Sequence, residues 1–461
     1  MKYANIAPMM NPKSVAVIGA SETPGKVGYA IMQNYVDVGF KGEIYPVNIN
    51  AMDKIMGYKA YKSVSEIKKP IDLVVVCTPA ETVPGILLEC GKAKAKGAVV
   101  VSAGFAEVGN AKLEEKLVAA AKKYNLPVIG PNCLGVMDPR TGNDTLFLPT
   151  YKIDRPKMGG VSFVSQSGSI GSSILDLISA EGFGLAKFIS YGNASVVDEV
   201  DLLNYLAHDK DTKVIVFYIE GVKRGKEFVE LAKSATKLKP VVILKGGITP
   251  SGAMAAHSHT ASLAGSSEAY KAIFKQFGFV TAENLEDLLY FAKIFDTQPL
   301  TTGNRIGVIT NGGGHGVLAT DALYENGLAM PELGKETQKE LRAKMPPIVN
   351  IRLPLDIGGD AGKDRFDAAL DALMNDPSVD AIMSITLFQT PGADESVAAT
   401  IINHASKKIK PIVAVSTGSK YTTSHVQVME SAGVPVYESP TSAARALAAL
   451  VAYSRYRKKL V

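Results

Sequence analysis

Three segments of this chain share one pattern, a short apolar strand that leads directly into a turn of small residues. They read VAVIGAS from Val15, VSFVSQSG from Val161 and IGVITNGGG from Ile306. Their starts are almost equally spaced, and each interval is close to the ~150 residues that one domain commonly occupies. The sequence of 461 residues is therefore predicted to form three α/β domains of related architecture, one after another.

Between these segments, apolar runs of strand length alternate with amphipathic stretches of helix length. This alternation is typical of a parallel sheet with helices on both faces, so each domain is predicted to be doubly wound. Connections containing Gly and Pro lie at 149–160 and 296–305. We place the domains accordingly at 1–148, 149–298 and 299–461.

Composition and charge argue against several classes of protein. The net charge is only +5 and the basic residues are scattered, apart from the tail SRYRKKLV. The first residues lack a leader pattern, and no apolar run approaches the ~18 residues of a membrane span. Cys77, Cys90 and Cys133 lack the paired spacing of disulfides or zinc ligands. We expect a cytoplasmic protein with no metal site of its own, no nucleic acid and no membrane as partner.

The turn after the first apolar strand, GASETPGKVG at 19–28, opens a helix and could hold a phosphate on its backbone N–H groups. It departs from a P-loop, because five residues separate its first two glycines and Val27 follows the lysine. An acidic residue for the ribose of NAD is also missing, since the second strand ends in PVNIN with Asn48 and Asn50. NAD and directly bound ATP are therefore disfavoured, and a purely structural turn stays an alternative.

The turns in the second and third repeats place small polar residues where a helix is expected to begin. Oriented donors and a positive helix end together stabilise a phosphate dianion. Each turn alone could be an ordinary tight turn, but as a pair they predict a site for a phosphoryl group. Their residues are Ser165, Gln166, Ser167 and Gly168 in the second repeat, and Asn311, Gly312, Gly313 and Gly314 in the third.

A stretch at 245–265, KGGITPSGAMAAHSHTASLAG, puts His257 and His259 among small residues. An imidazole in such a loop can enter a cleft and accept a phosphoryl group. Glu220 ends the strand KVIVFYIEGV, where a carboxylate could orient one ring nitrogen and leave the other to attack phosphorus. Residues two apart on an extended segment point to one side, so either histidine could be the nucleophile. The alternatives are an inert surface loop for the two histidines, and a helix cap or a solvent contact for Glu220.

Nine motifs follow one another along essentially the whole chain: GASETPGKVG, PVN, CTPAE, SAGFAE, GPNCLGV, SQSGS, YIEGV, SHTASLAG and NGGG. In this order they resemble the α subunit of the ADP-forming acetyl-CoA synthetases, or acetate–CoA ligases. More distantly, the first two domains are similar to the α subunit of succinyl-CoA synthetase, and 353–382 to the carboxyl-terminal part of its β subunit. The resemblance implies a Rossmann-like CoA-binding domain followed by two flavodoxin-like domains.

The resemblance also implies a reaction in which acyl-CoA and phosphate give acyl phosphate, whose phosphoryl group passes to histidine and then to ADP. The family's Ser-His-Thr pattern places the nucleophile at His259, with His257 as the alternative and Glu220 as the orienting carboxylate. The turns Ser165–Gly168 and Asn311–Gly314 would hold the phosphate. Coenzyme A would be bound by Gly19, Ser21, Gly25, Lys26, Val27, Gly28, Asn48, Ser102, Gly104 and Asn132.

The family binds its nucleotide on an ATP-grasp domain, for which three α/β domains leave no room in this sequence. The resemblance thus implies a separate β subunit that binds ADP or ATP with Mg²⁺, in an α2β2 assembly. Two rival interpretations stay open. One is a catalytically silent CoA-binding scaffold, and the other is an NAD-dependent oxidoreductase, which the missing ribose acid disfavours.

Overall fold

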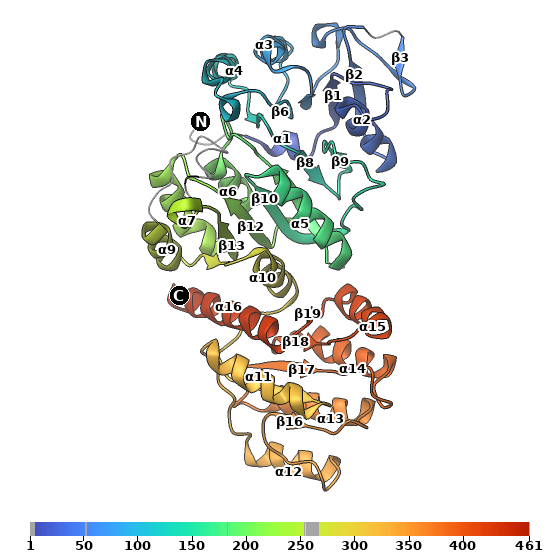
Figure 1. Ribbon diagram of the computed structural model, residues 1–461, viewed down its shortest axis with the longest axis vertical. Coiled ribbons are helices and arrows are strands. Elements are labelled where there is room, and N and C mark those ends of the chain that lie inside the picture. Colours follow the sequence, from blue (N-terminus) through green and yellow to red (C-terminus); the bar gives the residue numbers. More distant parts are fainter. Residues whose placement is uncertain (1–4, 51–52, 182, 253, 255–266, 461) are drawn as a thin grey trace. The chain divides into compact units, whose positions relative to one another are not determined.

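The computed structural model describes residues 5–50, 53–181, 183–252, 254 and 267–460 (Figure 1). The chain divides into two compact units. The first unit holds the described residues up to Thr281 except Glu181 and Phe183, and the second holds those two and everything from Ala282 on. Each unit is described by itself below.

The first unit contains two sheets, one parallel and one mixed. Its first sheet has the order β2-β1-β5-β6-β7. The strands are β1 (Ser14–Ile18), β2 (Glu43–Val47), β5 (Leu73–Val76), β6 (Ala98–Val100) and β7 (Val128–Ile129). Its helices are α1 (Ala7–Met10), α2 (Val27–Asp37), α3 (Val83–Lys92) and α4 (Ala111–Lys123), with a small hairpin formed by β3 (Lys54–Ile55) and β4 (Tyr58–Lys59).

The second sheet of this unit has the order β14-β13-β12-β10-β11-β8-β9. Its parallel strands are β10 (Met158–Ser165), β11 (Leu185–Ser190), β12 (Val214–Ile219), β13 (Val241–Lys245) and β14 (Val280–Thr281). An antiparallel edge is added by β8 (Gly135–Asp138) and β9 (Asn143–Asp144). The helices are α5 (Gly168–Glu181), α6 (Glu199–His208), α7 (Gly225–Leu238) and α9 (Ser267–Gln276).

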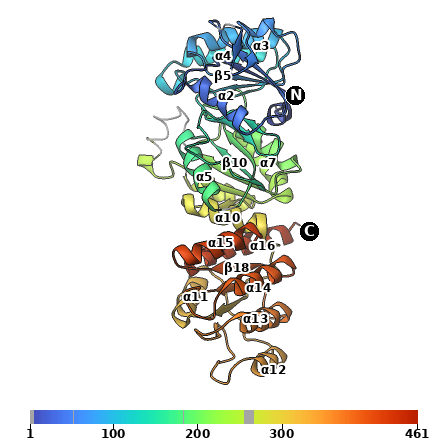
Figure 2. The same ribbon diagram turned by 90° about the vertical axis from the view of Figure 1, so that its right-hand side faces the viewer.

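The second unit is built on one parallel sheet of order β16-β15-β17-β18-β19. Its strands are β15 (Ile306–Thr310), β16 (Leu355–Asp356), β17 (Ala381–Ile385), β18 (Ile412–Val415) and β19 (Val436–Tyr437). Helices α10 (Leu285–Thr297), α11 (Gly313–Glu325) and α16 (Pro440–Lys458) pack together, as do α12 (Lys335–Lys344), α13 (Lys363–Asn375), α14 (Glu395–Ser406) and α15 (Lys420–Ser431) (Figure 2).

The parallel strands of all three sheets follow one order. Counted from β1, β10 or β15, each sheet runs 2-1-3-4-5, so the repeated segment always supplies the first strand beside the third. Connections leave these two strands in opposite directions, which opens a crevice at their carboxyl ends. The predicted fold class is confirmed. The domain boundaries stay a prediction, and β8 and β9, which precede 149, pair with the second sheet.

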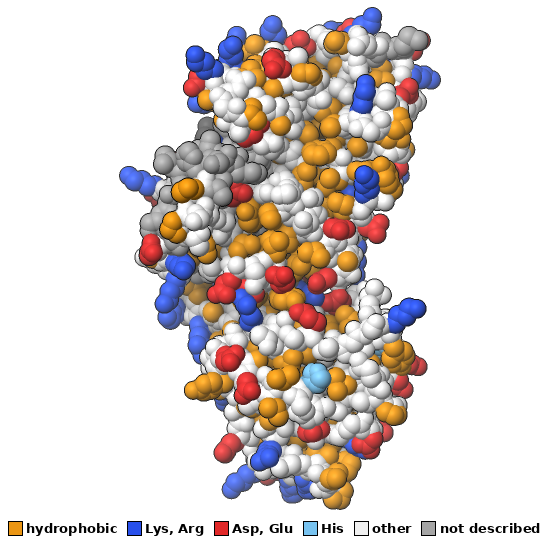
Figure 3. All heavy atoms as spheres, viewed as in Figure 1, with side chains coloured by type: hydrophobic (Ala, Val, Ile, Leu, Met, Phe, Trp, Pro, Cys, Tyr) orange, Lys and Arg blue, Asp and Glu red, His pale blue; other side chains and the backbone are white. Residues whose placement is uncertain are grey.

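Apolar strands supply the interior of each layer. Strands β1, β5 and β6 are buried along their whole length, as expected for a sheet covered on both faces. Acidic and basic side chains are mixed over the face seen in Figure 3. Within the described residues, no helix is both long and apolar enough to span a bilayer.

Candidate functional site

Close packing of glycines shapes the turn after β1. Gly19 has φ +94°, and a Cβ on Gly28 would lie 2.0 Å from the carbonyl oxygen of Gly19. Helix α2 therefore begins directly against the turn, an approach that only glycine permits at Gly28. Gly25, with φ +84°, completes the turn.

Polar side chains hold the same turn in place. Ser21 Oγ accepts the N–H of Thr23 at 3.0 Å, and Asn48 Nδ2 donates to the carbonyl oxygen of Ala20 at 2.9 Å. Asn48 stands where an NAD-binding domain has its ribose acid, and here it holds the turn after β1 in place. Lys26 is exposed and directly precedes α2.

The loops after β6 and β7 meet beside this turn. Ser102 Oγ donates to the carbonyl oxygen of Thr78 at 2.5 Å, and the N–H of Asn132 donates to the carbonyl oxygen of Ser102 at 2.9 Å. Gly104 (φ +114°) and Asn132 (φ +57°) both have left-handed backbones. The predicted CoA residues of three loops therefore lie on one edge of the first sheet.

The Ser165–Gly168 turn is fastened to the end of β12. Gln166 Oε1 accepts the N–H groups of Glu220 at 2.7 Å and Gly221 at 3.2 Å. Ser165 Oγ donates to the carbonyl oxygen of Ser167 at 2.6 Å, and α5 begins at Gly168. The turn thus presents the first N–H groups of α5 at the crevice of the second sheet.

Glu220 is 6% exposed and lies at the carboxyl end of β12. The hydroxyl of Tyr218 donates to Glu220 Oε1 at 3.4 Å, and Lys245 Nζ donates to the carbonyl oxygen of Glu220 at 2.8 Å. Burial, and secondly the Glu220 charge, raise the pKa of Tyr218 to about 12, so this hydroxyl stays protonated. Burial also lowers the pKa of Lys245.

A cavity of about 480 Å³ connects the two sets of predicted residues. It is lined by Val27, Ser102 and Asn132 from the predicted CoA site and by Gln166, Ser167 and Gly168 from the predicted phosphate site. A thioester lying along the CoA residues can therefore reach the Ser165–Gly168 turn within one hollow of the first unit.

The same cavity is lined by residues that the sequence analysis did not assign, namely Cys77, Thr78, Val101, Ala103, Cys133, Leu134, Phe147, Ser169, Gly192 and Asn193. Four of them belong to two motifs that carried the resemblance: Cys77 and Thr78 to CTPAE, and Cys133 and Leu134 to GPNCLGV, in which the sequence analysis had assigned only Asn132. Burial raises the pKa of Cys77 and of Cys133 to about 12, so both thiols are neutral and shape the wall.

The Asn311–Gly314 turn belongs to the second unit. Asn311 Oδ1 accepts the N–H of Leu387 at 2.8 Å, and its Nδ2 donates to Thr390 Oγ1 at 3.0 Å. Helix α11 begins at Gly313, and a Cβ there would lie 2.8 Å from Asp356 Oδ2. A shared phosphate site between this turn and Ser165–Gly168 stays a prediction.

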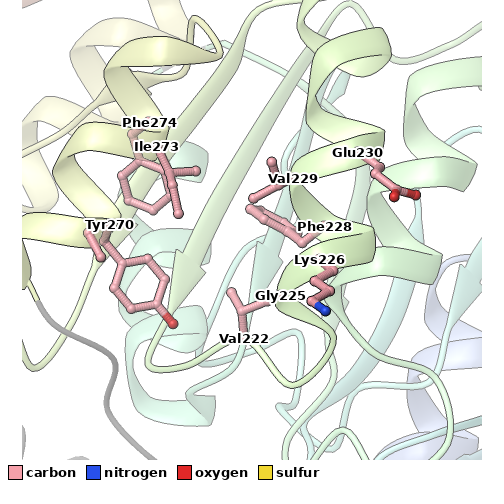
Figure 4. A pocket seen from close by; sticks show the side chains of 10 residues that line it. Val222, Gly225, Lys226, Phe228, Val229, Glu230, Tyr270, Ile273 and Phe274 are labelled. Carbon is pink, nitrogen blue, oxygen red and sulfur yellow. The ribbon is translucent and has the colours of Figure 1, made fainter.

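A second cavity of the first unit, about 540 Å³, lies between α7 and α9. Figure 4 shows Tyr270, Ile273 and Phe274 on one side and Val222, Phe228 and Val229 on the other. Of the predicted site residues that the structure describes, none lines this hollow. His257 and His259 lie outside the described residues, so the choice between them stays open. Among the described residues, no three His, Cys, Asp or Glu side chains are grouped to hold a metal ion.

Family models match the chain in three consecutive parts. A CoA-binding domain matches 13–139, a succinyl-CoA ligase-like flavodoxin domain matches 158–295 and a ligase-CoA domain matches 306–460. The alpha subunit of acetate–CoA ligase (ADP-forming) II of Pyrococcus furiosus is 40% identical over 96% of this chain and 96% of its own length. The chain belongs to the ADP-forming acetate–CoA ligase alpha subunits.

Other relatives of this ligase family differ in length. The acetate–CoA ligase (ADP-forming) of Methanocaldococcus jannaschii is 42% identical over 97% of this chain, which spans 63% of that longer protein. Among solved structures, an acetyl-coenzyme A synthetase of Ca. Korarchaeum cryptofilum, in complex with phosphate and ADP, matches with TM-score 0.92 and 36% identity. That match covers 98% of each chain.

Proposed function

We propose that this chain is the α subunit of an ADP-forming acyl-CoA synthetase that converts acetyl-CoA, phosphate and ADP into acetate, CoA and ATP. The observation that carries the proposal is the single cavity lined by Val27, Ser102 and Asn132 together with Gln166, Ser167 and Gly168. A CoA thioester and an inorganic phosphate must meet for the first step, and this hollow offers both sets of contacts. The full-length similarity to named alpha subunits supports the same reaction.

In the first step, a phosphate oxygen attacks the thioester carbonyl carbon. The carbon–oxygen bond forms, the carbon–sulfur bond breaks, and CoA leaves as its thiol. The Ser167 hydroxyl and the first N–H groups of α5 hold the phosphate and the charge that develops on it. The neutral walls formed by Cys133 and Leu134 keep water from competing for the acyl group.

In the second step, an imidazole nitrogen attacks the phosphorus of the acyl phosphate. The nitrogen–phosphorus bond forms, the bond to the acyl oxygen breaks, and the carboxylate leaves. His259 is the proposed nucleophile, and Glu220 balances the charge of the imidazolium that forms. Gln166 Oε1 accepts the backbone N–H of Glu220 at 2.7 Å. This hydrogen bond fixes the Ser165–Gly168 turn and Glu220 relative to each other.

In the last step, ADP takes the phosphoryl group from histidine on a separate β subunit, in an α2β2 assembly. Two Pyrococcus furiosus relatives are named as alpha subunits, which supports a second kind of chain. Mg²⁺ is proposed to bind with the nucleotide on that partner, and no step on this chain passes through a metal. A CoA-binding scaffold without phosphoryl transfer is the rival that the following experiment separates.

The test is to incubate the full chain with acetyl-CoA and radiolabelled phosphate and to map the labelled peptide. Acid-labile label is expected within 245–266, only when acetyl-CoA is present, and ATP is expected only after a β subunit and ADP are added. Label that forms without acetyl-CoA, or that lies elsewhere, would overturn the assignment. A chain that binds CoA but never takes label would establish the silent scaffold.

A further inference from the structure

Two carboxylates accept hydrogen bonds from the side-chain amide of Asn193, which lines the 480 Å³ cavity of the first unit. Asn193 is 5% exposed, and its Nδ2 donates to Glu107 Oε2 at 2.6 Å and to Glu114 Oε2 at 2.9 Å. Both acceptors come from the first sheet's loops and helices, whereas Asn193 follows β11 of the second sheet. The amide therefore joins the two layers on either side of the cavity.

These contacts fix the direction of a second amide. Ionised carboxylates only accept hydrogen bonds, so Asn193 must turn its NH₂ group toward them and its Oδ1 away. That Oδ1 accepts from Asn132 Nδ2 at 3.3 Å. Asn132 in turn directs its own NH₂ group at Asn193, so its Oδ1 is the end left to accept from another partner, and Asn132 lines the cavity.

Glu107 is held as an acceptor by its surroundings. Its Oε1 accepts the N–H groups of Gly104 at 2.6 Å and Phe105 at 3.1 Å. Partial burial opposes the charge, but the hydrogen bonds from Asn193 and from these backbone groups outweigh it and lower the pKa of Glu107. The carboxylate is therefore ionised at neutral pH. Asn132 then donates to Asn193 and Asn193 donates to Glu107, and the reverse arrangement would leave Glu107 Oε2 without its donor.

We infer that Glu107 is a positioning residue which, acting through Asn193, makes Asn132 present a hydrogen-bond acceptor to an N–H group of the pantetheine arm of CoA. The inference rests on the proposed function. Val27, Asn132 and Ser167 line one cavity, so the inference places the arm of a thioester that spans this cavity against Asn132. The arm carries two amide N–H groups as well as amide carbonyls and a hydroxyl, so an oxygen on the wall selects the orientation of the arm in which an N–H group faces Asn132.

Two isosteric variants separate the relay from simple loss of charge. In Glu107→Gln the backbone N–H groups of Gly104 and Phe105 still require an oxygen at the position of Oε1. The new NH₂ group therefore takes the position of Oε2 and faces Asn193 Nδ2, donor against donor. A flipped Asn193 then faces Glu114 with its oxygen, and every arrangement leaves one mismatch. In Glu114→Gln the oxygen can stay between Ala106 and Asn193, while the NH₂ group meets Ser195 Oγ, which accepts as readily as it donates.

Calorimetry on the full chain with CoA tests this difference. Glu107→Gln is expected to weaken CoA binding about tenfold, the usual worth of one hydrogen bond, and Glu114→Gln by no more than about twofold. Adenosine 3′,5′-bisphosphate, which lacks the pantetheine arm, should bind both variants as it binds the parent chain. Asn132→Ala should itself cost about tenfold, and adding Glu107→Gln to it should change nothing further.

Several outcomes would overturn the relay while CoA binding by the parent chain still upholds the proposed function. These are equal effects of the two glutamine variants on CoA, a parallel loss of the bisphosphate in Glu107→Gln, or additive losses in the double variant. Such results would mean that Glu107 only holds its loop. A parent chain that binds no CoA would instead remove the proposed function, and the relay with it.

Discussion

The turns Ser165–Gly168 and Asn311–Gly314 occupy the same place in two sheets of the same strand order. In each, the amide side chain that directly follows the first strand accepts a backbone N–H from one or two residues beyond the end of the third strand. Gln166 accepts the N–H of Glu220 at 2.7 Å, and Asn311 accepts the N–H of Leu387 at 2.8 Å. These matching bonds make Glu220 and Leu387 equivalent positions in the repeat.

What differs is the chemistry at these equivalent positions. In the first unit, the carboxylate of Glu220 follows β12, and the Ser165–Gly168 turn lines a cavity. The second unit has Leu387 there, and a Cβ on Gly312 would lie 2.4 Å from Leu387 Cδ1. Asp356 also sets a negative charge beside the start of α11, where an anion would have to bind. We therefore expect phosphoryl chemistry to depend on the residues around each turn rather than on the turn alone.

The largest effect is expected at His259, the proposed phosphoryl acceptor, which follows β13 in the sequence. His259→Ala should abolish acid-labile label and overall turnover with a β subunit, because no other nucleophile stands in the family's Ser-His-Thr position. His257→Ala is the matched control and should keep measurable label. A live His259→Ala beside a dead His257→Ala would exchange the two roles.

The next effect tests whether Glu220 and Leu387 really differ in function. Glu220→Gln keeps the shape and should slow labelling by roughly 10²–10⁴-fold, because the imidazolium loses its counter-charge. Leu387→Met, a change of similar volume, should leave the labelling rate within about threefold. Single-turnover labelling with acetyl-CoA and phosphate measures both. Comparable losses at the two positions would contradict the contrast between the units.

A smaller effect compares the two turns directly. Ser167→Ala should raise the KM for phosphate roughly tenfold or more, because a hydrogen bond to a charged group is lost. Gly314→Ala should leave it within about twofold, since nothing lies within 4 Å of an added Cβ, and should stabilise α11 by about 1 kcal/mol. A rise in KM for Gly314→Ala as large as that for Ser167→Ala would place phosphate directly on the third repeat's turn.

The repeat and the alternation of strands and helices were sufficient to predict three doubly wound sheets, because alternating helices cover both faces of a parallel sheet. The strand order was not predicted. The strands β8 and β9 were not foreseen. They are short, and they extend the second sheet because β8 pairs with β11 and β9 pairs with β8. The family resemblance itself came from motif order and is confirmed.

The candidate site was predictable as a set of turns but not as a set of contacts. Gly19 and Gly28 follow from local geometry, since a tight turn against a helix demands glycine. Gln166 and Asn311 were predicted to bind phosphate, which stays a prediction, and each also fastens its turn to a strand end far along the chain, which the sequence did not reveal. Asn193 belongs to none of the motifs, and its position in the cavity wall depends on Glu107 and Glu114, which lie 86 and 79 residues away in the sequence.

The smallest expected effect probes the charge beside α11. Asp356→Asn removes that charge while its oxygen can still accept the N–H of Gly358, which Asp356 Oδ1 binds at 3.0 Å. If the third repeat's turn faces phosphate, loss of the repulsion should lower the KM for phosphate by up to about threefold at low salt. The gain should fade at high salt, because exposed charges are screened over ~10 Å or less.

The same change should destabilise the second unit by about 0.3–1 kcal/mol, since a negative charge near a helix start is favourable. Asp360→Asn is the control. Asp360 pairs with Arg365 at 2.6 Å and is not the carboxylate beside Gly313, so its loss should leave the KM for phosphate unchanged. Equal KM values for phosphate in Asp356→Asn, Asp360→Asn and the parent chain would mean that the Asn311–Gly314 turn does not bind the phosphate. Phosphate binding would then be a property of the first unit's turn, and the repeat would have kept its geometry in the second unit without its chemistry.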